Sequence, residues 1–464
     1  MSQLTNRTFD EIKVGATETV SRTLTATDVE ALALAAGDVE GFHLEGGSPD
    51  ERISAQGAAA IALVAGLLNR RLPGPGSAII GTAFRYAGAC HIGDTLTATV
   101  TAKTRHKRTS TIDFPCTCTN QHGATLVDGV AMVQAPTERV AYADVATPEL
   151  VLRRNDGFAK LFKQCEALPP VTCAIVHPCD RDALTGPIEA AKRGLIVPIL
   201  VGPEARIRAV ARAEGIDLSP YQLVSVEHSH AAAAKSVELA RAGHVDALMK
   251  GSLHTDELMG AVVSTADGLR TARRISHVFV MDVPTYADTL FVTDAAINIF
   301  PDLEGKRDII QNAIDLFTQV GFGTSPRVAI LSAVETVTSK IPSTIEAAAL
   351  CKMADRGQIT GGLLDGPLAF DNAIDVEAAR IKGIKSEVAG RAQILVVPDL
   401  EAGNMLAKNL AYLAKADSAG IVLGARVPIV LTSRADSPRA RMASCAVAAL
   451  YADARRHRAS VAAA

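Results

Sequence analysis

The sequence contains no tryptophan, few aromatic residues and no long apolar run. Its 464 residues include only 12 Phe and 6 Tyr, whereas alanine and the aliphatic residues are abundant, which favours Ala-rich helices packed closely on aliphatic strands. No stretch reaches the roughly 20 apolar residues of a membrane span. The opening residues also lack the basic start and apolar core of a signal peptide. These absences predict a cytoplasmic protein without a membrane partner.

Neither sign of charge is in excess, since 47 Lys and Arg residues face 50 Asp and Glu residues. No basic stripe for nucleic acid is visible, so small molecules are the expected partners. The eight cysteines form no CxxC pair. Cys116 and Cys118 stand two apart in a strand-like run, where both side chains face the same way. No metal site and no disulfide framework are predicted.

The length exceeds what one hydrophobic core usually serves, so more than one domain is expected. Residues 1–145 predict an α+β domain. Thr27 and Glu30 form a candidate capping box for a short helix that ends at Gly37. A long Ala-rich helix is expected from Ser54 to about Arg71. Four strand-like runs then follow one another, at residues 77–88, 94–104, 109–120 and 126–135.

The pattern changes after a linker at about residues 135–158. A second domain is expected over residues 155–464, because short aliphatic strands there alternate with helices, which is typical of a parallel α/β sheet. Such sheets bind ligands beyond the carboxyl ends of their strands. The strand-like runs lie at residues 172–178, 197–203, 221–227, 245–251, 327–333, 393–399 and 427–433.

Asp38 and His43 lie five residues apart in a Gly-rich loop after the first predicted helix. A carboxylate and an imidazole this close can hold one water, which the imidazole deprotonates while the acid orients it or returns a proton. That is the chemistry for adding water across an enoyl thioester. The alternative is structural, with Asp38 capping a turn and His43 solvated.

The segments GDVEGFH, AQGAAAIAL and GDTLTATVTA resemble the MaoC-like hotdog family of (R)-specific enoyl-CoA hydratases over residues 8–140. The resemblance implies that Asp38 and His43 are the catalytic pair and that the backbone N–H of Gly57 binds the thioester carbonyl. The chain departs from the family at Glu40-Gly41, where Asn-Pro is usual, and at Gln56, where His is usual. The open alternative is a module retained for acyl-CoA binding or assembly.

Two segments of the second domain are suited to phosphate. Arg270, Arg273 and Arg274 follow a loop that contains Ser264 and Thr265, and hydroxyls next to guanidinium groups suit a phosphate or the CoA pyrophosphate. An ordinary basic helix face is the alternative. Ser433 and Arg434 come directly after a buried-strand pattern and could orient a thiol and hold an acyl phosphate. For Ser433 the alternative is a helix cap.

The segments STADGLR, GLLDGPLAFDNA, VAGRAQILVVPDLEAGN and PIVLTSRADS, in this order, resemble the phosphate acetyl/butyryltransferase family over about residues 155–455. The resemblance implies a two-lobed, isocitrate-dehydrogenase-like α/β domain that transfers an acyl group between acyl phosphate and CoA. It also implies a ternary complex, no tightly bound cofactor and a homo-oligomer. Ser433 would stabilise the CoA thiolate, Arg434 and Arg270 would bind phosphate, and Ser264 and Thr265 would line the substrate site.

The chain departs from the acetyl-type members in having Ala440 where they have an Asp proposed as thiol base. Arg439 and Arg441 flank it and could favour the thiolate instead. Asp436 would face away if a helix began at Ser433. GLLDGPLAFDNA and TSRADS look closer to the butyryl type.

Two other functions compete with this interpretation of the second domain. A metal- and NAD-dependent decarboxylating dehydrogenase would need clustered carboxylates and a GxGxxG after a strand, neither of which is evident. A non-enzymatic acyl-CoA sensor would keep the CoA cleft and lose the catalytic residues, whereas Ser433 and Arg434 are present.

Overall fold

The computed structural model describes residues 3–37, 54–55, 58–143, 157–432 and 436–463. The chain divides into two compact units, Met1–Leu152 and Arg153–Ala464. Five of the candidate site residues lie outside the described residues: Asp38, His43, Gly57, Ser433 and Arg434.

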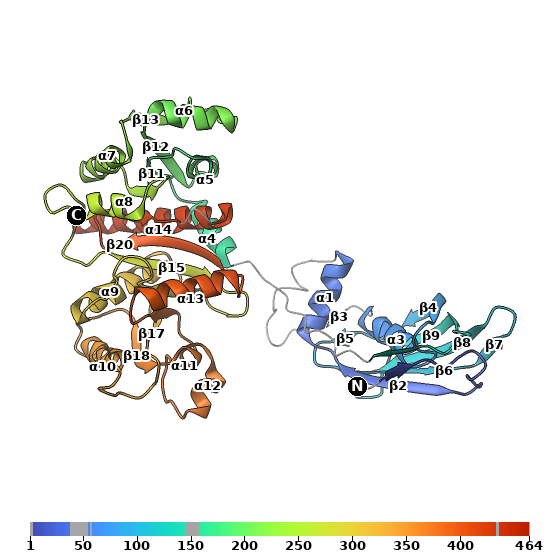
Figure 1. Cartoon of the computed structure of the whole chain (residues 1–464). Helices are drawn as coiled ribbons and strands as arrows, with labels where there is room; N and C mark the ends of the chain where they lie inside the picture. The colour runs from blue at the N-terminus through green and yellow to red at the C-terminus, as the bar shows by residue number, and fades with distance from the viewer. Residues whose placement is uncertain (1–2, 38–53, 56–57, 144–156, 433–435, 464) are drawn as a thin grey trace. The chain divides into compact units, whose positions relative to one another are not determined.

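The first unit is an antiparallel sheet with a helix against one face (Figure 1). Its described helices are α1 (Ala26–Ala36) and α3 (Ala58–Arg70). The main sheet has the order β2-β6-β8-β9-β4, with β7 paired to β8, while β1 pairs with β10 and β3 with β5. The strands are β1 (Gln3–Thr5), β2 (Thr17–Thr23), β3 (Ser54–Ala55), β4 (Ala78–Tyr86), β5 (Cys90–His91), β6 (Thr95–Thr101), β7 (Thr104–His106), β8 (Thr111–Thr119), β9 (Thr125–Gln134) and β10 (Ala141–Ala143).

Alternation of side chains explains how this sheet buries one face. In β6 every second residue is buried, beginning with Leu96 and Ala98, and the intervening threonines face outward. Phe114 of β8 and Leu68 of α3 are both fully buried in the same cluster. A long helix lying on a curved antiparallel sheet is the hotdog arrangement, so the α+β prediction for this part of the chain is confirmed.

Three local expectations in this unit were wrong. The capping box of α1 is formed by Thr25 and Asp28, two residues before the predicted pair, because the helix starts earlier. The long helix begins at Ala58 and not at Ser54, since Ser54–Ala55 pair with Cys90–His91 as strand β3. The four predicted strands omitted β2, which pairs with β6 along its whole length. Gly37 does end α1, in a left-handed conformation.

The second unit is built around one large mixed sheet (Figure 1). Its strands are β11 (Val171–Val176), β12 (Ile196–Gly202), β13 (Gln222–Ser225), β14 (Ala247–Lys250), β15 (Ser276–Asp282), β16 (Leu290–Thr293), β17 (Arg327–Leu331), β18 (Leu363–Leu368), β19 (Ile394–Val396), β20 (Asp417–Leu423) and β21 (Ile429–Val430). Its helices are α4 (Gly157–Cys165), α5 (Arg181–Lys192), α6 (Glu204–Ala213), α7 (Ser229–Arg241), α8 (Thr255–Val262), α9 (Leu303–Gln319), α10 (Pro342–Asp355), α11 (Phe370–Ile374), α12 (Val376–Ile381), α13 (Leu400–Tyr412) and α14 (Pro438–Ala463).

The sheet order β13-β12-β11-β14-β21-β20-β15-β16-β19-β17-β18 divides into two lobes. In the first lobe β11 to β14 and β21 are parallel, and in the second β16 to β19 are parallel. The alternating strands and helices predicted these parallel parts, and the two-lobed α/β fold is confirmed.

The antiparallel middle of the sheet was not predicted. Strand β20 pairs antiparallel with β21 on one side and with β15 on the other, because the chain reverses after Leu423 at the turn of Gly424, whose φ is 84°. Helix α14 packs along β20 (Figure 1). None of the helices in the described part of the chain is long and apolar enough to cross a membrane.

The two cores can be tested separately with a matched pair of substitutions. Phe114 and Phe291 are both fully buried, the first in the core of the first unit and the second in the core of the second. Removing either ring should cost about 3–5 kcal/mol. We expect calorimetry of the full chain to show that Phe114→Ala and Phe291→Ala each lower a different unfolding transition. A variant that lowers both transitions equally would show that the units unfold together.

Candidate active site

Strands β11, β14 and β21 of the second unit end at the same edge of the sheet. Val176 pairs with Lys250, and Met249 pairs with Val430, in parallel register. The residues that follow these three strands therefore lie next to one another. Because parallel α/β sheets bind ligands beyond the carboxyl ends of their strands, this edge is the candidate site. It is called the carboxyl edge below.

His177 is the first residue after β11 and adopts a left-handed backbone conformation, with φ of 58°. This conformation costs a non-glycine residue about 1–3 kcal/mol and is found most often at functional sites. The imidazole Nδ1 lies 3.1 Å from the carbonyl oxygen of Ser252. The Ser252 hydroxyl donates a 2.8 Å hydrogen bond to the carbonyl oxygen of His177. The two strand ends are thus joined through these residues.

Burial lowers the pKa of the His177 imidazole, which is only 5% exposed. A neutral imidazole whose Nδ1–H points to the Ser252 carbonyl leaves Nε2 as an acceptor. His177 was not singled out in the sequence. The available signal was a His-Pro pair directly after a buried strand pattern.

Gly251 makes the close approach of β14 to β11 possible. A Cβ at this position would lie 2.4 Å from the carbonyl oxygen of Val176 and 2.7 Å from that of His177. The Gly251 N–H instead donates to Val176 at 2.9 Å, and the Ser252 N–H donates to His177 at 2.9 Å. Only glycine fits here without moving backbone.

Helix α8 begins three residues after Ser252 and points its amino end toward this edge. Glu257 in its first turn accepts hydrogen bonds from the His254 N–H at 3.3 Å and from the Ser229 hydroxyl at 2.5 Å. It also lies 3.4 Å from the ring of His230. The Ser229 hydrogen bond is the main reason that the pKa of Glu257 is lowered. These contacts hold the starts of α7 and α8 together.

Ser264, Thr265 and Arg270 lie on the loop after α8, away from the carboxyl edge. Arg270 forms an isolated bridge with Ala425 in the turn before β21, whereas Leu431 after β21 donates to Gly420. Gly420 lies within β20, whereas Ala425 follows the turn at Gly424 after the end of that strand.

Of the three arginines predicted to bind phosphate from this loop, Arg270 has the guanidinium group that is available to a ligand. Its side chain is exposed and makes no hydrogen bond or ion pair with another described residue. Arg273, by contrast, lies 2.7 Å from Asp315. Arg274 Nε donates to Asn298 at 2.8 Å, and the Asn298 amide donates to the buried Asp294. The side chains of Arg273 and Arg274 therefore already contact other residues of the second unit.

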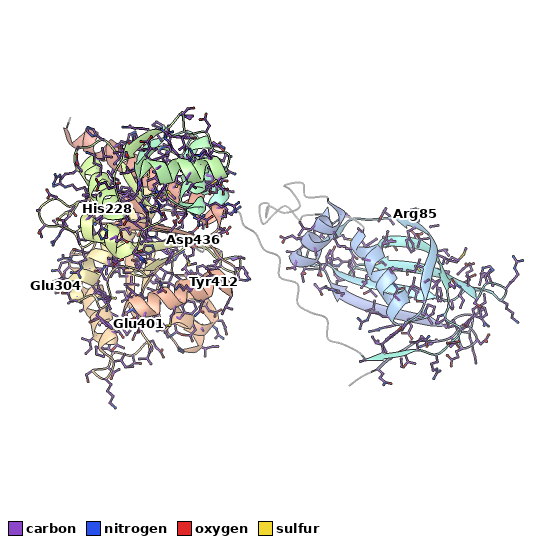
Figure 2. The ribbon with its side chains drawn as sticks, turned by 45° about the horizontal axis from the view of Figure 1, so that its top comes forward. Arg85, His228, Glu304, Glu401, Tyr412 and Asp436 are labelled. Atoms are coloured by element: carbon purple, nitrogen blue, oxygen red, sulfur yellow. The ribbon has the colours of Figure 1, made fainter. Side chains whose placement is uncertain are left out.

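The segment after β21 leads into α14, which begins at Pro438. The Ser437 hydroxyl accepts from the Ala440 N–H at 3.1 Å and so caps this helix. Ser433, for which a helix cap was the alternative, lies outside the described residues. Asp436, labelled in Figure 2, lies before this cap and therefore outside α14. The expectation that its carboxylate faces away depended on a helix that starts at Ser433.

The two arginines that flank Ala440 are already paired with carboxylates. Arg439 Nε lies 2.6 Å from Asp417, and Arg441 lies 3.6 Å from Asp182. Ala440 itself is buried. A paired guanidinium favours a neighbouring anion less than a free one. Stabilisation of a thiolate by these two cations is therefore weaker than the sequence alone indicated.

Comparison with known proteins decides the identity of this unit. A model of the family described as phosphate acetyl/butaryl transferase matches residues 228–449. A phosphate acetyltransferase from Rhizobium meliloti is 71% identical over 306 residues, which cover 66% of this chain and 96% of that protein. The chain belongs to the phosphate acetyl/butyryltransferase family.

Other similarities of this phosphate acyltransferase cover different shares of the chain. A phosphate butyryltransferase from Clostridium beijerinckii is 39% identical and covers 64% of this chain and 98% of that protein. A branched-chain phosphotransacylase structure from Enterococcus faecalis has a TM-score of 0.54 at 27% identity and covers 61% of this chain and 99% of that one. An R-hydratase structure from Pseudomonas aeruginosa has a TM-score of 0.31 at 24% identity, and the match covers 32% of this chain and 99% of that one.

The first unit of this phosphate acyltransferase contains an apolar pocket of about 600 Å³ between α1 and α3. Leu32 of α1, Leu63 of α3 and Leu96 of β6 are among its lining residues. Arg22 and Asp28 at the pocket form an ion pair of 2.5 Å. Gly37, the last described residue of this segment, ends α1 directly before Asp38 in the sequence.

Within the described ranges, no group of three or more His, Cys, Asp or Glu side chains is arranged to hold a metal ion. All eight cysteines are free thiols. Burial raises the pKa values of Cys116 and Cys118 to about 11, so these two thiols stay protonated at neutral pH.

The close approach at Gly251 can be tested against a second glycine. Gly251→Ala should lower the unfolding temperature of the second unit and reduce transferase activity, because its Cβ would overlap two carbonyl oxygens. Gly260, inside α8, has open space around its Cβ position, so Gly260→Ala should be neutral or stabilising by up to about 1 kcal/mol. Equal unfolding temperatures for the two variants would contradict the packing described.

Proposed function

We propose that the second unit transfers an acetyl group, in preference to butyryl, between acetyl phosphate and CoA at the carboxyl edge. The observation that supports acetyl is the 71% identity to a phosphate acetyltransferase, against 39% to a phosphate butyryltransferase. The segments GLLDGPLAFDNA and TSRADS had suggested the butyryl type. We propose residues 155–464 as the limits of this domain.

The positions of the described residues support the proposed roles. Ser433 and Arg434 follow Thr432 in the sequence, and Thr432 lies two residues beyond β21 on the side of the carboxyl edge. Ser433 orients the CoA thiol there, and Arg434 holds the phosphoryl oxygens of the acyl phosphate. Arg270, which has no partner among the described residues, binds a phosphate from the loop, together with Ser264 and Thr265.

The reaction needs positioning and charge stabilisation. The thiol loses its proton, the thiolate attacks the carbonyl carbon, and the bond from that carbon to the phosphate oxygen breaks as inorganic phosphate leaves. Negative charge develops on the carbonyl oxygen and on the departing phosphate. Guanidinium groups and hydroxyls that are already in place stabilise this charge without reorganising.

The transferase proposal predicts a large effect at Arg434. Arg434→Ala should lower kcat/KM by about 10²–10³, because one bidentate contact to the phosphoryl group is worth roughly 2–4 kcal/mol in the transition state. Arg208 is exposed on α6 and pairs with Glu204 among the described residues, so it provides the control, and Arg208→Ala should retain wild-type rates. The assay is phosphate-dependent release of CoA from acetyl-CoA and butyryl-CoA. Wild-type turnover of Arg434→Ala would refute the phosphate site.

For the first unit we propose hydration of a short enoyl-CoA, with residues 1–145 as the domain. The apolar pocket beside α1 and α3 supports this proposal, because its volume of about 600 Å³ suits an acyl chain. Asp38 and His43 act on one water, and the Gly57 N–H binds the thioester carbonyl. A binding or assembly role without turnover is the alternative.

If the first unit is a hydratase, mutations in it should remove hydration and leave acyl transfer unchanged. Asp38→Asn or His43→Ala should remove nearly all hydration of crotonyl-CoA, since each acid–base group contributes about 10²–10⁴ in rate. Phosphate-dependent transfer should stay unchanged in both variants. Chiral analysis of the 3-hydroxyacyl-CoA product measures the first activity, and CoA release measures the second. A wild-type protein that forms no 3-hydroxyacyl-CoA would leave the first unit as a binding or assembly module.

A further inference from the structure

We propose that His177 is the base that removes the proton from the CoA thiol, an inference that rests on the proposed transferase function. The acetyl-type family position for such a base is occupied by Ala440, and Arg439 and Arg441 beside it are already paired with carboxylates. A thiol needs an acceptor for its proton at neutral pH, where only a few per cent of a group with pKa near 8.5 is ionised.

The location of His177 is set by strand register. His177 follows β11, Gly251 follows β14 beside it, and Thr432 continues β21 on the far side of Gly251. With strands spaced about 4.8 Å apart, the backbone of His177 is roughly 10 Å from that of Thr432. The imidazole spans part of this interval, because its Nδ1 faces the Ser252 carbonyl on the β14 side.

Orientation of the ring makes Nε2 the proton acceptor. The Nδ1–H donates to the carbonyl oxygen of Ser252, and Nε2 makes no hydrogen bond with any described residue. The main chain of His177 is packed on two sides, because Gly251 lies close to its carbonyl group and Gly202 lies against its Cα. A strained, nearly buried histidine with one nitrogen committed and one available is organised as a base.

The charged groups around His177 are compatible with a neutral base. Arg206 of α6 disfavours its protonation, whereas Glu257 of α8 and Asp180, which caps α5, favour it. Burial is the largest influence and lowers the pKa of the imidazole. His177 is therefore mainly unprotonated at pH 7 and able to accept a proton.

The proposed step balances without any further reactant. The S–H bond breaks as Nε2 takes the proton, and the thiolate forms the bond to the carbonyl carbon while the phosphate leaves with the bonding pair. The imidazolium then returns its proton to the departing phosphate. In the reverse direction the same group protonates the CoA sulfur as it leaves.

The test is the pH profile of His177→Gln in the direction that forms acetyl-CoA from acetyl phosphate and CoA. At pH 7 kcat should fall by about 10²–10³, with KM for CoA changed less than about threefold. The loss should shrink about tenfold per pH unit up to the thiol pKa near 8.5, a recovery of about thirtyfold in all, because the thiol then ionises by itself. His244→Gln is the control, since His244 is exposed before β14 at the opposite end of that strand, and its profile should match wild type.

Two other outcomes would overturn the inference. A loss in His177→Gln by the same factor at every pH would show that the residue has only a structural role. Wild-type activity in His177→Gln would show that it has none. If His177→Gln does not fold, the wild-type profile still decides. Activity measured as kcat/KM for CoA must fall as the pH drops through the pKa of His177, which lies below 6.5, and a profile without such a fall excludes the base. Wild-type protein without any transfer overturns the transferase proposal itself.

Discussion

Pairing of β14 with β21 is the contact on which the site of the second unit depends. These strands come from distant segments of the chain, because Leu248 and Met249 lie in register with Ile429 and Val430, 181 residues further on. The pairing places the segment after β21 beside the segments after β11 and β14. The approach of β14 to β11 on its other side requires a glycine at position 251, because a Cβ there would overlap the carbonyl oxygens of Val176 and His177.

The cations of the second unit fall into two groups by their partners. Arg273, Arg274, Arg439 and Arg441 contact acidic or amide side chains of the fold, so their charge is largely satisfied before any ligand arrives. Arg270 has no such contact with a described residue. A guanidinium without a protein partner is the one that gains most from a phosphate.

The buried polar residues show how the second lobe is tied to the middle of the sheet. Asp294 accepts hydrogen bonds from the backbone N–H groups of Ala296 and Ile297 and from Asn298. Asn298 then accepts from Arg274 at the start of β15. Burial lowers the pKa of the neighbouring His277 to about 3, so it remains neutral within the sheet. These groups stabilise the arrangement around β15 and β16.

The sequence by itself determined the two fold classes, because hydrophobic periodicity is local and survives without knowledge of the partner strand. It also determined the family, through four segments whose order is retained. Only the tertiary structure decided that β20 and β21 turn back antiparallel, that α14 starts at Pro438, and that His177 and Ser252 meet. The reason is physical: strand register, close backbone approach and ion pairing depend on residues far apart in the chain, and no local pattern records which distant groups come into contact.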